Sequence, residues 1–484
     1  MAVTFKETYG LFIGGEFTPA LSGETFDVFN PATGEKLAAA AKAEAADVDR
    51  AVKAAWSAFP QWAAMNVRDR SELLWAISDI VEENLEYLTE IETLNNGKLL
   101  REARCDIEDV VDQFRYFASC IRSGEGSYVD QGDGNFNILK REPLGVVGQI
   151  VPWNYPLSMA CWKIAPAMAA GNCIVIKPAS STPLSLLIFA ELVQSVIPAG
   201  VLNIVTGGGG SCGEALAAHP DIRKIAFTGS TAVGAKIGAI AGGNIIPSTL
   251  ELGGKSAQIL FPDCQWDRAL DSVCEGILSN AGQICSAGSR AFIHADIYDE
   301  FVQALTERFQ AVKVGDGMDD ESEMGPVIDS HQLEVILDYV AIGKAEGARL
   351  VTGGNRKCGG DFDKGYFMEP TLFADVTNQM RIAQEEIFGP VLACIRFTDE
   401  KEVIDMANDS PYGLAGSVWT QDINRGIRVA GAIGAGLVWI NAFDLYPAGT
   451  SFGGYKKSGY GREAHKTTLD SYSQMKSIFV ATAE

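Results

Sequence analysis

Cys285 is the residue whose surroundings best suit nucleophilic chemistry. It lies among small residues where a helix is expected to end and a turn to begin, Asn280-Ala281-Gly282-Gln283-Ile284-Cys285-Ser286-Ala287-Gly288-Ser289-Arg290. A cysteine at such a turn can be accessible, and a nearby backbone amide can stabilise an oxyanion. The alternative is an inert buried thiol, the ordinary state of a cysteine in a chain that has 10 of them.

A second turn suits phosphate binding. In Phe227-Thr228-Gly229-Ser230-Thr231-Ala232-Val233-Gly234, a predicted strand ends in small polar residues just before an amphipathic helix. Free amides and the positive end of a helix dipole would face a phosphate there. A simple N-cap by Ser230 or Thr231 explains the same residues equally well.

A third glycine pattern has the spacing of a dinucleotide fingerprint. Gly208-x-Gly210-x-x-Gly213 follows the predicted strand Leu202–Val205 and opens a helix. However, the acidic residue expected about 20 positions later, at the end of a following strand, is missing. We therefore interpret this pattern as a tight structural turn and not as the pyrophosphate site.

These turns need a scaffold, and from Gly145 onward short apolar runs alternate with helical segments. The predicted strands are Val146–Val151, Cys173–Lys177, Leu202–Val205 and Lys224–Phe227. The predicted helices are Leu157–Ala169, Leu184–Val196, Ser211–Ala218 and Thr231–Ala241. Such alternation is typical of a parallel sheet with right-handed crossovers, so we predict a doubly wound, Rossmann-like α/β domain.

The flanking regions differ from this pattern. Helical periodicity dominates the first hundred residues, where Asp47 is expected to cap a helix that runs through Phe59. An apolar stripe follows at Leu73, Leu74, Ile77, Val81, Leu85 and Leu88. A second alternation has predicted strands at Ala257–Leu260, Ala291–His294, Val391–Phe397, Gly416–Trp419 and Leu437–Asn441. The segment Ser123–Leu139 becomes extended and Tyr472–Ala481 is a β-type tail, so a small β element is expected beside the two α/β parts.

Composition excludes several classes of function. The net charge of −23 would repel nucleic acid and anionic membrane surfaces, so neither is an expected partner. The cysteines form no CxxC pair and the 4 histidines lie far apart, so we expect no metal site and no disulfide framework. Without a signal peptide, free thiols indicate the cytoplasm. The apolar stretch Leu144–Pro178 is broken by prolines and by Lys163, so it is too interrupted to span a membrane.

Seven segments in the same order resemble the motifs of the aldehyde dehydrogenase superfamily. One is the Cys285 segment and another is the Phe227-Thr228-Gly229-Ser230 turn. The others are Pro152-Trp153-Asn154-Tyr155-Pro156-Leu157, Ile176-Lys177-Pro178, Leu250-Glu251-Leu252-Gly253-Gly254-Lys255, Glu385-Glu386-Ile387-Phe388-Gly389-Pro390-Val391 and Phe452-Gly453-Gly454-Tyr455-Lys456-Lys457-Ser458-Gly459. The resemblance extends from about Leu11 to the last ten residues. It implies an NAD(P)-dependent oxidation of an aldehyde to a carboxylic acid.

The resemblance also implies a catalytic role for each matching residue. Cys285 would attack the aldehyde carbon as a thiolate. Asn154 and the Cys285 backbone amide would stabilise the oxyanion. After transfer of hydride to the nicotinamide, Glu251 would activate water against the thioester. Lys177 is expected to take part in both catalysis and cofactor binding.

On the cofactor side, the resemblance implies contacts with each part of the dinucleotide. Lys177 would bind the ribose hydroxyls, and Trp153 would lie beside the adenosine. Gly229 and Ser230 would meet the pyrophosphate. Glu386 would accept from the nicotinamide ribose and Phe388 would bound the nicotinamide. Strictly NAD-dependent members commonly carry a glutamate at the position of Ser180, so its serine predicts that NADP is accepted as well as NAD.

The substrate pocket is the least specific part of the resemblance. Matching positions that line the aldehyde tunnel in relatives are Tyr155, Met159, Trp162, Ile284 and Phe452. Several segments look most like the aminoaldehyde and betaine aldehyde branch. There Asp106 and Asp109, on one face of a predicted helix Asp106–Ile121, would attract an ammonium group. The alternatives are a solvated acidic face and a general aliphatic or aromatic aldehyde substrate.

The resemblance implies a three-part fold and a homodimer or homotetramer. An NAD(P)-binding domain is expected at 1–123 and 144–250, a catalytic domain at 251–446, and oligomerisation segments at 124–143 and 447–484. Three other functions remain open: a cofactor-independent cysteine esterase, a non-catalytic structural relative, and a variant that forms acyl-coenzyme A.

Overall fold

An eight-stranded sheet is built mainly from the first half of the chain. In the computed structural model, which describes residues 3–482, its strand order is β22-β12-β11-β8-β9-β10-β2-β3. The five strands from β12 to β10 are parallel; four of them were predicted, and β12 was not. The strands are β2 (Leu11–Ile13), β3 (Glu16–Thr18), β8 (Val146–Ile150), β9 (Cys173–Lys177), β10 (Leu202–Ile204), β11 (Lys224–Thr228), β12 (Ser248–Glu251) and β22 (Gly459–Tyr460). The doubly wound α/β prediction is confirmed.

The helices around this sheet lie close to the predicted segments but differ at their ends. They are α1 (Ala45–Ala64), α2 (Val67–Glu83), α3 (Leu85–Asn96), α4 (Leu100–Cys120), α5 (Pro156–Ala169), α6 (Leu184–Val193), α7 (Glu214–Ala218) and α8 (Thr231–Gly243). Helix α1 continues past Phe59 because Trp62 in its last turn is buried. Asp47 is its third residue and accepts from the Glu44 amide in a capping box. The apolar stripe spans two helices separated at Asn84.

Helix α4 begins six residues earlier than predicted, at Leu100 instead of Asp106. The Glu102 carboxylate accepts from the Leu99 amide, which completes the cap. The first forty residues also contain strands that helical periodicity did not predict. Two of them, β2 and β3, join the eight-stranded sheet, and β1 (Thr8–Tyr9), β4 (Thr25–Phe29) and β5 (Lys36–Ala41) form a separate sheet of order β1-β5-β4. Alanine favours helices, so the four alanines of β5 hide its extended conformation, which pairing with β4 imposes.

A seven-stranded sheet of order β15-β16-β17-β14-β13-β19-β20 forms the second α/β part. Its strands are β13 (Ala257–Leu260), β14 (Arg290–His294), β15 (Arg349–Thr352), β16 (Thr371–Ala374), β17 (Val391–Phe397), β19 (Ala415–Trp419) and β20 (Leu437–Ile440). Its helices are α9 (Trp266–Leu278), α10 (Tyr298–Ala311), α11 (Ser330–Ala345), α12 (Arg381–Gln384), α13 (Glu400–Asn408) and α14 (Ile423–Ala432). All five strands predicted here exist, and the sequence reading missed only the two at one edge, β15 and β16.

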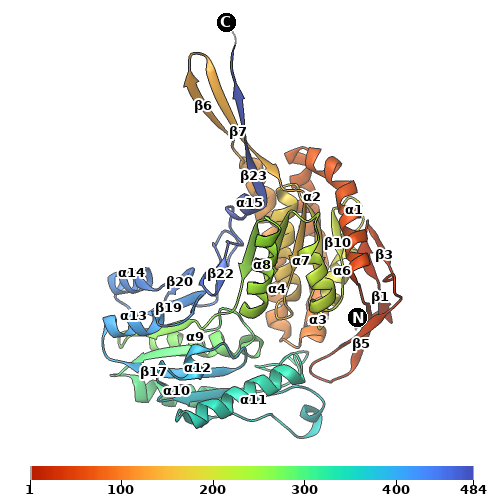
Figure 1. The fold of residues 1–484 in the computed structure, drawn as a ribbon. Coiled ribbons are helices and arrows are strands. Elements are labelled where there is room, and N and C mark those ends of the chain that lie inside the picture. Colours follow the sequence, from red (N-terminus) through yellow and green to blue (C-terminus); the bar gives the residue numbers. More distant parts are fainter. Residues whose placement is uncertain (1–2, 483–484) are drawn as a thin grey trace.

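A three-stranded β arm projects away from both sheets (Figure 1). It consists of β6 (Ser127–Gly132), β7 (Asn135–Pro143) and β23 (Ser473–Val480), with α15 (Thr468–Ser471) at its base. The tail strand β23 pairs antiparallel with β7 along its whole length. The prediction of an extended tail is therefore confirmed. The small remaining elements are β18 (Tyr412–Gly413), β21 (Tyr455–Lys456), η1 (Ile121–Ser123), η2 (Gly209–Gly213), η3 (Ser279–Gly282) and η4 (Gly360–Asp363).

Within residues 3–482, no helix is both long and apolar enough to cross a membrane. The same residues contain no cluster of histidine, cysteine and carboxylate side chains that could hold a metal ion.

Candidate active site

A cavity of about 990 Å³ is lined by residues from both α/β parts. It brings together thirteen of the predicted site residues: Asp109, Trp153, Asn154, Tyr155, Met159, Trp162, Gly229, Ser230, Glu251, Cys285, Glu386, Phe388 and Phe452. Three others, Lys177, Ser180 and Ile284, do not line it. The volume is at the upper end of the range for small-molecule sites.

The loop that carries Cys285 is held in an unusual backbone conformation. After α9 ends at Leu278, Asn280 and Ala281 have φ values of 47° and 53° inside η3. A side chain on Gly282 would collide with the backbone of Gly389, so this loop packs directly on the segment that carries Phe388. Left-handed non-glycine residues store strain, and such strain collects at functional sites. The two loops thus set the position of a half-buried Cys285 at the cavity.

Two N–H groups are available to an oxyanion near the thiol. Within residues 3–482, no oxygen accepts a hydrogen bond from the Cys285 backbone amide. The Asn154 side chain donates one N–H to the Gln283 carbonyl at 2.8 Å, which fixes its orientation and leaves its second N–H. Unsatisfied donors aimed at a reacting centre are the arrangement that stabilises a developing negative charge.

The thiol itself is not acidic in the protein alone. Burial raises the pKa of Cys285 to about 12, and the carboxylates of Glu386, Glu251 and Asp444 add electrostatic repulsion. The thiol is therefore protonated at neutral pH until a base or a positive charge assists it.

Glu251, at the end of β12, is a buried carboxylate without a hydrogen bond. Its side chain is 3% exposed, and neither oxygen has a partner among the described residues. Burial and the nearby Glu463 raise its pKa well above the usual value, while Lys163, Arg462 and the nearby Gly454 backbone amide act in the opposite direction. Lys163 forms a buried ion pair with Glu463, at 2.7 Å, and donates to Thr228 at 2.6 Å. The sequence reading missed this pair because its members are 300 residues apart.

The cofactor side of the cavity has an acceptor, an aromatic corner and a helix N-terminus. Glu386 accepts from the Gly254 amide at 2.9 Å through one oxygen only, and burial raises its pKa to about 7. The rings of Trp153 and Phe388 meet edge to face with centroids 5.3 Å apart. Ser230 caps α8 by accepting from the Val233 amide, so both the capping and the phosphate interpretations of this turn remain compatible with the geometry.

Lys177 and Ser180 lie at the end of the neighbouring strand and share one acceptor. The Lys177 ammonium donates to the Gly207 carbonyl at 3.2 Å, and the Ser180 hydroxyl donates to the same oxygen at 2.9 Å. The glycine pattern at 208–213 forms η2 and then α7, and Gly213 lies against the Lys177 side chain. The loop interpreted as a structural turn is therefore a neighbour of the predicted ribose-binding lysine.

The acidic pair predicted for substrate binding is already engaged within the protein. Asp106 forms an ion pair with the buried Lys98, which lies 3.9 Å from the Tyr155 ring centroid. Asp109 accepts from Trp162 at 2.6 Å and from Ser158 at 2.7 Å through one oxygen, and from Gln113 at 3.1 Å through the other. The expectation that this pair offers free carboxylates to a substrate is therefore corrected.

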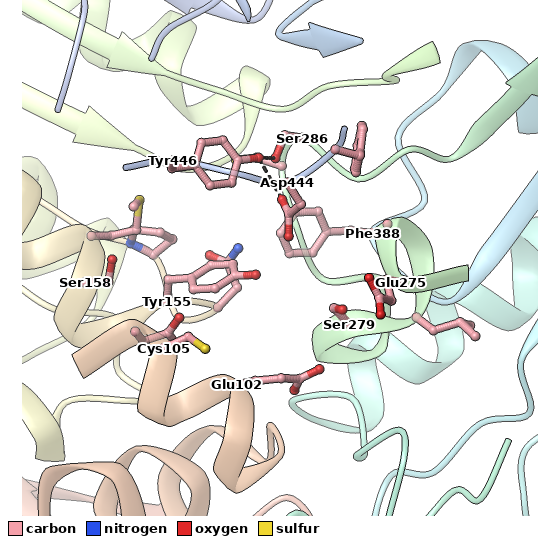
Figure 2. Close-up of a pocket in the computed structure, with 18 of the residues that line it drawn as sticks. Glu102, Cys105, Tyr155, Ser158, Glu275, Ser279, Ser286, Phe388, Asp444 and Tyr446 are labelled. Atoms are coloured by element: carbon pink, nitrogen blue, oxygen red, sulfur yellow. Dashed lines mark hydrogen bonds between the residues drawn. The ribbon is translucent and has the colours of Figure 1, made fainter. Parts of the chain in front are cut away.

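Ile284, contrary to the prediction, also does not line the substrate cavity. It is 4% exposed and faces a separate small cavity lined by Ile277 and Val391. Since it and Cys285 are consecutive in an irregular loop, one side chain reaches the main cavity while the other packs into the core. The structure instead adds residues that sequence reasoning missed at the cavity: Glu102, Glu275, Ser286, Asp444 and Tyr446 (Figure 2). Nothing in their spacing distinguished them.

The charge of the cavity is strongly one-sided. Its lining contains nine carboxylates and two arginines and no lysine. One arginine, Arg308, already pairs with Asp271. Asp106 likewise pairs with Lys98, and burial raises the pKa of Glu251, Asp109 and Glu386, so the lining carries less negative charge than nine ionised carboxylates would. Its shortage of cations still disfavours anionic ligands.

Comparisons with known proteins agree with this geometry. A model of the aldehyde dehydrogenase family matches residues 17–478. The chain is 47% identical to an acetaldehyde dehydrogenase of Pseudomonas aeruginosa, over 99% of this chain and 96% of the relative. An NAD+ complex of an aldehyde dehydrogenase from Bacillus cereus superposes with a TM-score of 0.96 at 45% identity, covering 98% and 96% of the two chains. An NAD+ complex of a betaine aldehyde dehydrogenase from Staphylococcus aureus has a TM-score of 0.96 at 40% identity, covering 97% and 94%.

Proposed function

The chain belongs to the aldehyde dehydrogenase family, and from that premise we propose that it oxidises an aldehyde to a carboxylic acid with NAD+ through a covalent adduct on Cys285. The observation that carries the proposal is the set of unsatisfied groups in one cavity. These are the Cys285 amide, the second N–H of Asn154 and both oxygens of Glu251. Buried polar groups are normally satisfied, so groups left free around a nucleophile indicate work on a ligand.

The first half of the reaction builds the adduct. The Cys285 sulfur, once deprotonated, forms a C–S bond to the carbonyl carbon, and the carbonyl π electrons move onto oxygen. That oxyanion accepts from the Cys285 amide and from Asn154. Bound NAD+ would supply the hydride acceptor, and loss of a hydride from the adduct leaves a thioester on Cys285.

The second half releases the acid. Glu251 takes a proton from water as the water oxygen bonds to the thioester carbon. The C–S bond then breaks, and the carboxylic acid leaves with Cys285 restored. The raised pKa of Glu251 suits this step, because a base whose pKa lies nearer the working pH both accepts and releases a proton readily.

The residues present fit a dinucleotide. Glu386 has one carboxylate oxygen free for the nicotinamide ribose, and Phe388 gives apolar surface beside it. Because Trp153 packs against Phe388, we assign it to the nicotinamide side and not to the adenosine as the resemblance implied. The first turn of α8, directly after Gly229 and Ser230, presents the backbone amides of Thr231 and Ala232 for the pyrophosphate, whereas the Gly229 amide already donates to the Glu251 carbonyl at 3.1 Å. Lys177 would hold the adenosine ribose by exchanging its bonds to backbone carbonyls.

Acceptance of NADP+ remains part of the proposal. Ser180 carries no charge and lies beside Lys177, with which it shares the Gly207 carbonyl. A 2′-phosphate placed there would meet a hydroxyl donor and an ammonium instead of a repelling carboxylate.

The substrate class follows from the charge of the cavity. We infer that aldehydes with a positive or neutral tail are accepted and that aldehydes carrying a carboxylate are rejected. The nine carboxylates of the lining support this inference. It agrees with relatives named for acetaldehyde and for betaine aldehyde. Comparison of 3-aminopropanal, butanal and succinic semialdehyde by kcat/KM tests it, and a preference for the semialdehyde would reject it.

The mechanism is tested by trapping. Glu251→Gln should stop at the thioester, so mass spectrometry after mixing with butanal and NAD+ should find one butanoyl group on Cys285. Wild type and Cys285→Ala serve as controls, because neither should accumulate it. An acylated chain in Cys285→Ala, or no acylation in Glu251→Gln together with full turnover, would reject the assignment.

The β arm supports a homo-oligomer. Apolar side chains on it are exposed, among them Tyr128 at 64% and Phe479 at 59%. Such surface on an extended arm is typical of an interface between copies. Light scattering of the purified protein would test this, and a monomer at micromolar concentration would reject it.

A further inference from the structure

Three hydrogen-bonding side chains form a continuous chain beside Cys285, and the mechanism above gives them no role. The Ser286 hydroxyl oxygen lies 2.6 Å from the Tyr446 hydroxyl oxygen. Tyr446 in turn donates to one carboxylate oxygen of Asp444 at 2.8 Å. All three residues line the cavity, and Figure 2 shows them joined by dashed lines.

Both hydroxyl hydrogens of this group are used in bonds within it, so the three side chains can only accept hydrogen bonds from a ligand in the cavity. A phenol has a single hydrogen, and Tyr446 gives it to Asp444. Ser286 must therefore donate its hydrogen to the Tyr446 oxygen. Lone pairs on Ser286 and the second carboxylate oxygen of Asp444 remain. No donor within residues 3–482 reaches that second oxygen.

The acceptors are held rigidly. The Tyr446 ring packs edge to face against Trp162, Phe452 and Trp439, with centroids 6.2, 5.4 and 5.4 Å apart. Asp444 itself has a left-handed backbone with φ of 58°. Preorganised acceptors discriminate between ligands, because they cannot turn away from a ligand that fails to satisfy them.

The protein supplies no positive charge to this carboxylate. The charged neighbours that affect Asp444 are Glu102 and Glu275, and both are acidic. Both oxygens of Glu102 already accept from backbone amides, of Leu99 and Asn280. A donor for the second oxygen of Asp444 must therefore come from water in the cavity or from a ligand that displaces it.

We propose that Ser286, Tyr446 and Asp444 determine specificity by favouring short aldehydes that carry a hydrogen-bond donor, a hydroxyl or a primary ammonium, over alkyl isosteres. The proposal rests on the proposed function, since it assigns a substrate preference to the same site. Ser286 and Asp444 contact the hydrogen-bond donor of the substrate. Tyr446 is a positioning residue that sets the direction of the hydrogen bonds between them. An alkyl tail would leave buried acceptors unpaired, which is how sites built for a hydroxyl reject its isostere.

The test compares isosteric substrates on one enzyme preparation. Butanal and 3-hydroxypropanal differ by a methyl group in place of a hydroxyl, and neither is charged. We expect wild-type kcat/KM to favour 3-hydroxypropanal by roughly tenfold or more. The same ratio should fall toward one in Ser286→Ala and in Asp444→Asn. A ratio of two substrates does not depend on the folded fraction, so a poorly folding variant still gives an answer.

Ser279→Ala is the matched control, because it removes a hydroxyl that faces the same cavity and takes no part in the Ser286-Tyr446-Asp444 hydrogen bonds. It should leave the ratio within about twofold. A second arm compares 3-aminopropanal with 3-(trimethylammonio)propanal, which keeps the charge and removes the donor. We expect the primary amine to be preferred in wild type, and the preference to shrink in Asp444→Asn.

The proposal would be overturned by a wild-type hydroxyl-to-methyl ratio at or below one, by a ratio unchanged in both variants, or by an equal fall in Ser279→Ala. Equal use of the two cationic aldehydes would assign recognition to charge and would overturn it as well. Failure of the proposed function looks different, since wild type would then oxidise neither butanal nor 3-hydroxypropanal with NAD+.

Discussion

Two buried carboxylates lie on the same cavity, and the protein treats them in opposite ways. Both oxygens of Glu251 lack a hydrogen-bond partner among the described residues, whereas Asp109 accepts three hydrogen bonds from side chains. The pKa of each is raised, chiefly by burial. The difference shows that hydrogen bonding, and not burial or residue type, distinguishes a group kept free for chemistry from one that supports the wall.

Around Glu251 and Cys285 the reacting groups themselves are left unsatisfied at a cost in stability, whereas the Asp109 carboxylate is fully bonded and the unsatisfied atom beside it is Oε1 of Gln113. An unpaired buried carboxylate costs about 1–3 kcal/mol or more, so one that lies beside a nucleophile in a cavity indicates use by a ligand. Substitutions around Glu251 and Cys285 should change turnover. Substitutions around Asp109 should change the shape of the cavity wall and the stability of the protein.

Removal of the nucleophile gives the largest expected effect. Cys285→Ala should lower turnover by roughly 10⁴-fold or more, because no other group can form the adduct. Cys105→Ser, at the same cavity, and the exposed Cys358→Ser should keep most activity. Steady-state rates with butanal and NAD+ provide the measurement. Substantial turnover in Cys285→Ala would remove the basis of the comparison.

Loss of the free base comes next. Glu251→Gln should lower kcat by roughly 10²- to 10⁴-fold, because it keeps the shape but cannot take a proton from water. A stoichiometric burst of NADH should survive if Cys285 ionises without this base. Stopped-flow absorbance separates the burst from turnover, and wild-type turnover in the variant would show that Glu251 is only a strained structural group.

The pH dependence of wild-type thioester hydrolysis tests the same carboxylate, with a smaller expected change in rate than removal of Glu251. Because burial and Glu463 raise the pKa of Glu251, its base form is depleted at low pH and grows as pH rises through that pKa. Thioester hydrolysis should therefore accelerate with pH in wild type, with a midpoint above the usual range for a glutamate. The pH dependence of single-turnover acid release measures it, and Glu251→Gln should lose this limb.

A substitution of Ser180, at the edge of the cofactor site, should change cofactor preference by a smaller factor. Ser180→Glu should shift the ratio of kcat/KM for NADP+ over NAD+ by roughly 10- to 100-fold toward NAD+, the value of one charge-assisted contact. Ser181→Glu, one residue further along the same turn, is the matched control. A wild type that uses NAD+ alone would contradict the proposed role of Ser180.

The smallest effect is expected in the satisfied region. Asp109→Asn keeps one acceptor oxygen but puts an amide against a donor, so Trp162 should shift slightly. We expect KM to rise about two- to tenfold for cationic and neutral aldehydes alike, with a loss of roughly 1–2 kcal/mol in stability. A selective loss for cationic aldehydes would show that Asp109 contacts the substrate directly and would erase the contrast with Glu251.

The sequence was a good guide wherever local pattern and residue order carry the information. Parallel strands of the first sheet are short apolar runs bounded by turns, so β8 to β11 were found almost to the residue. It failed for β5 and for β15 and β16 at one edge of the second sheet, because pairing with another strand, and not the local residue pattern, imposed the extended conformation.

The same division applies to the site. The order of motifs by itself predicted the family, the fold class, and the residues Cys285, Glu251 and Asn154 that the cavity brings together. Only the tertiary structure decided which of those groups are free. Asp109 and Asp106 could not be distinguished from Glu251 by type or spacing, since their partners Ser158, Trp162 and Lys98 come from other elements. Hydrogen bonding and burial depend on contacts between residues far apart in the chain, and those contacts exist only once the chain has folded.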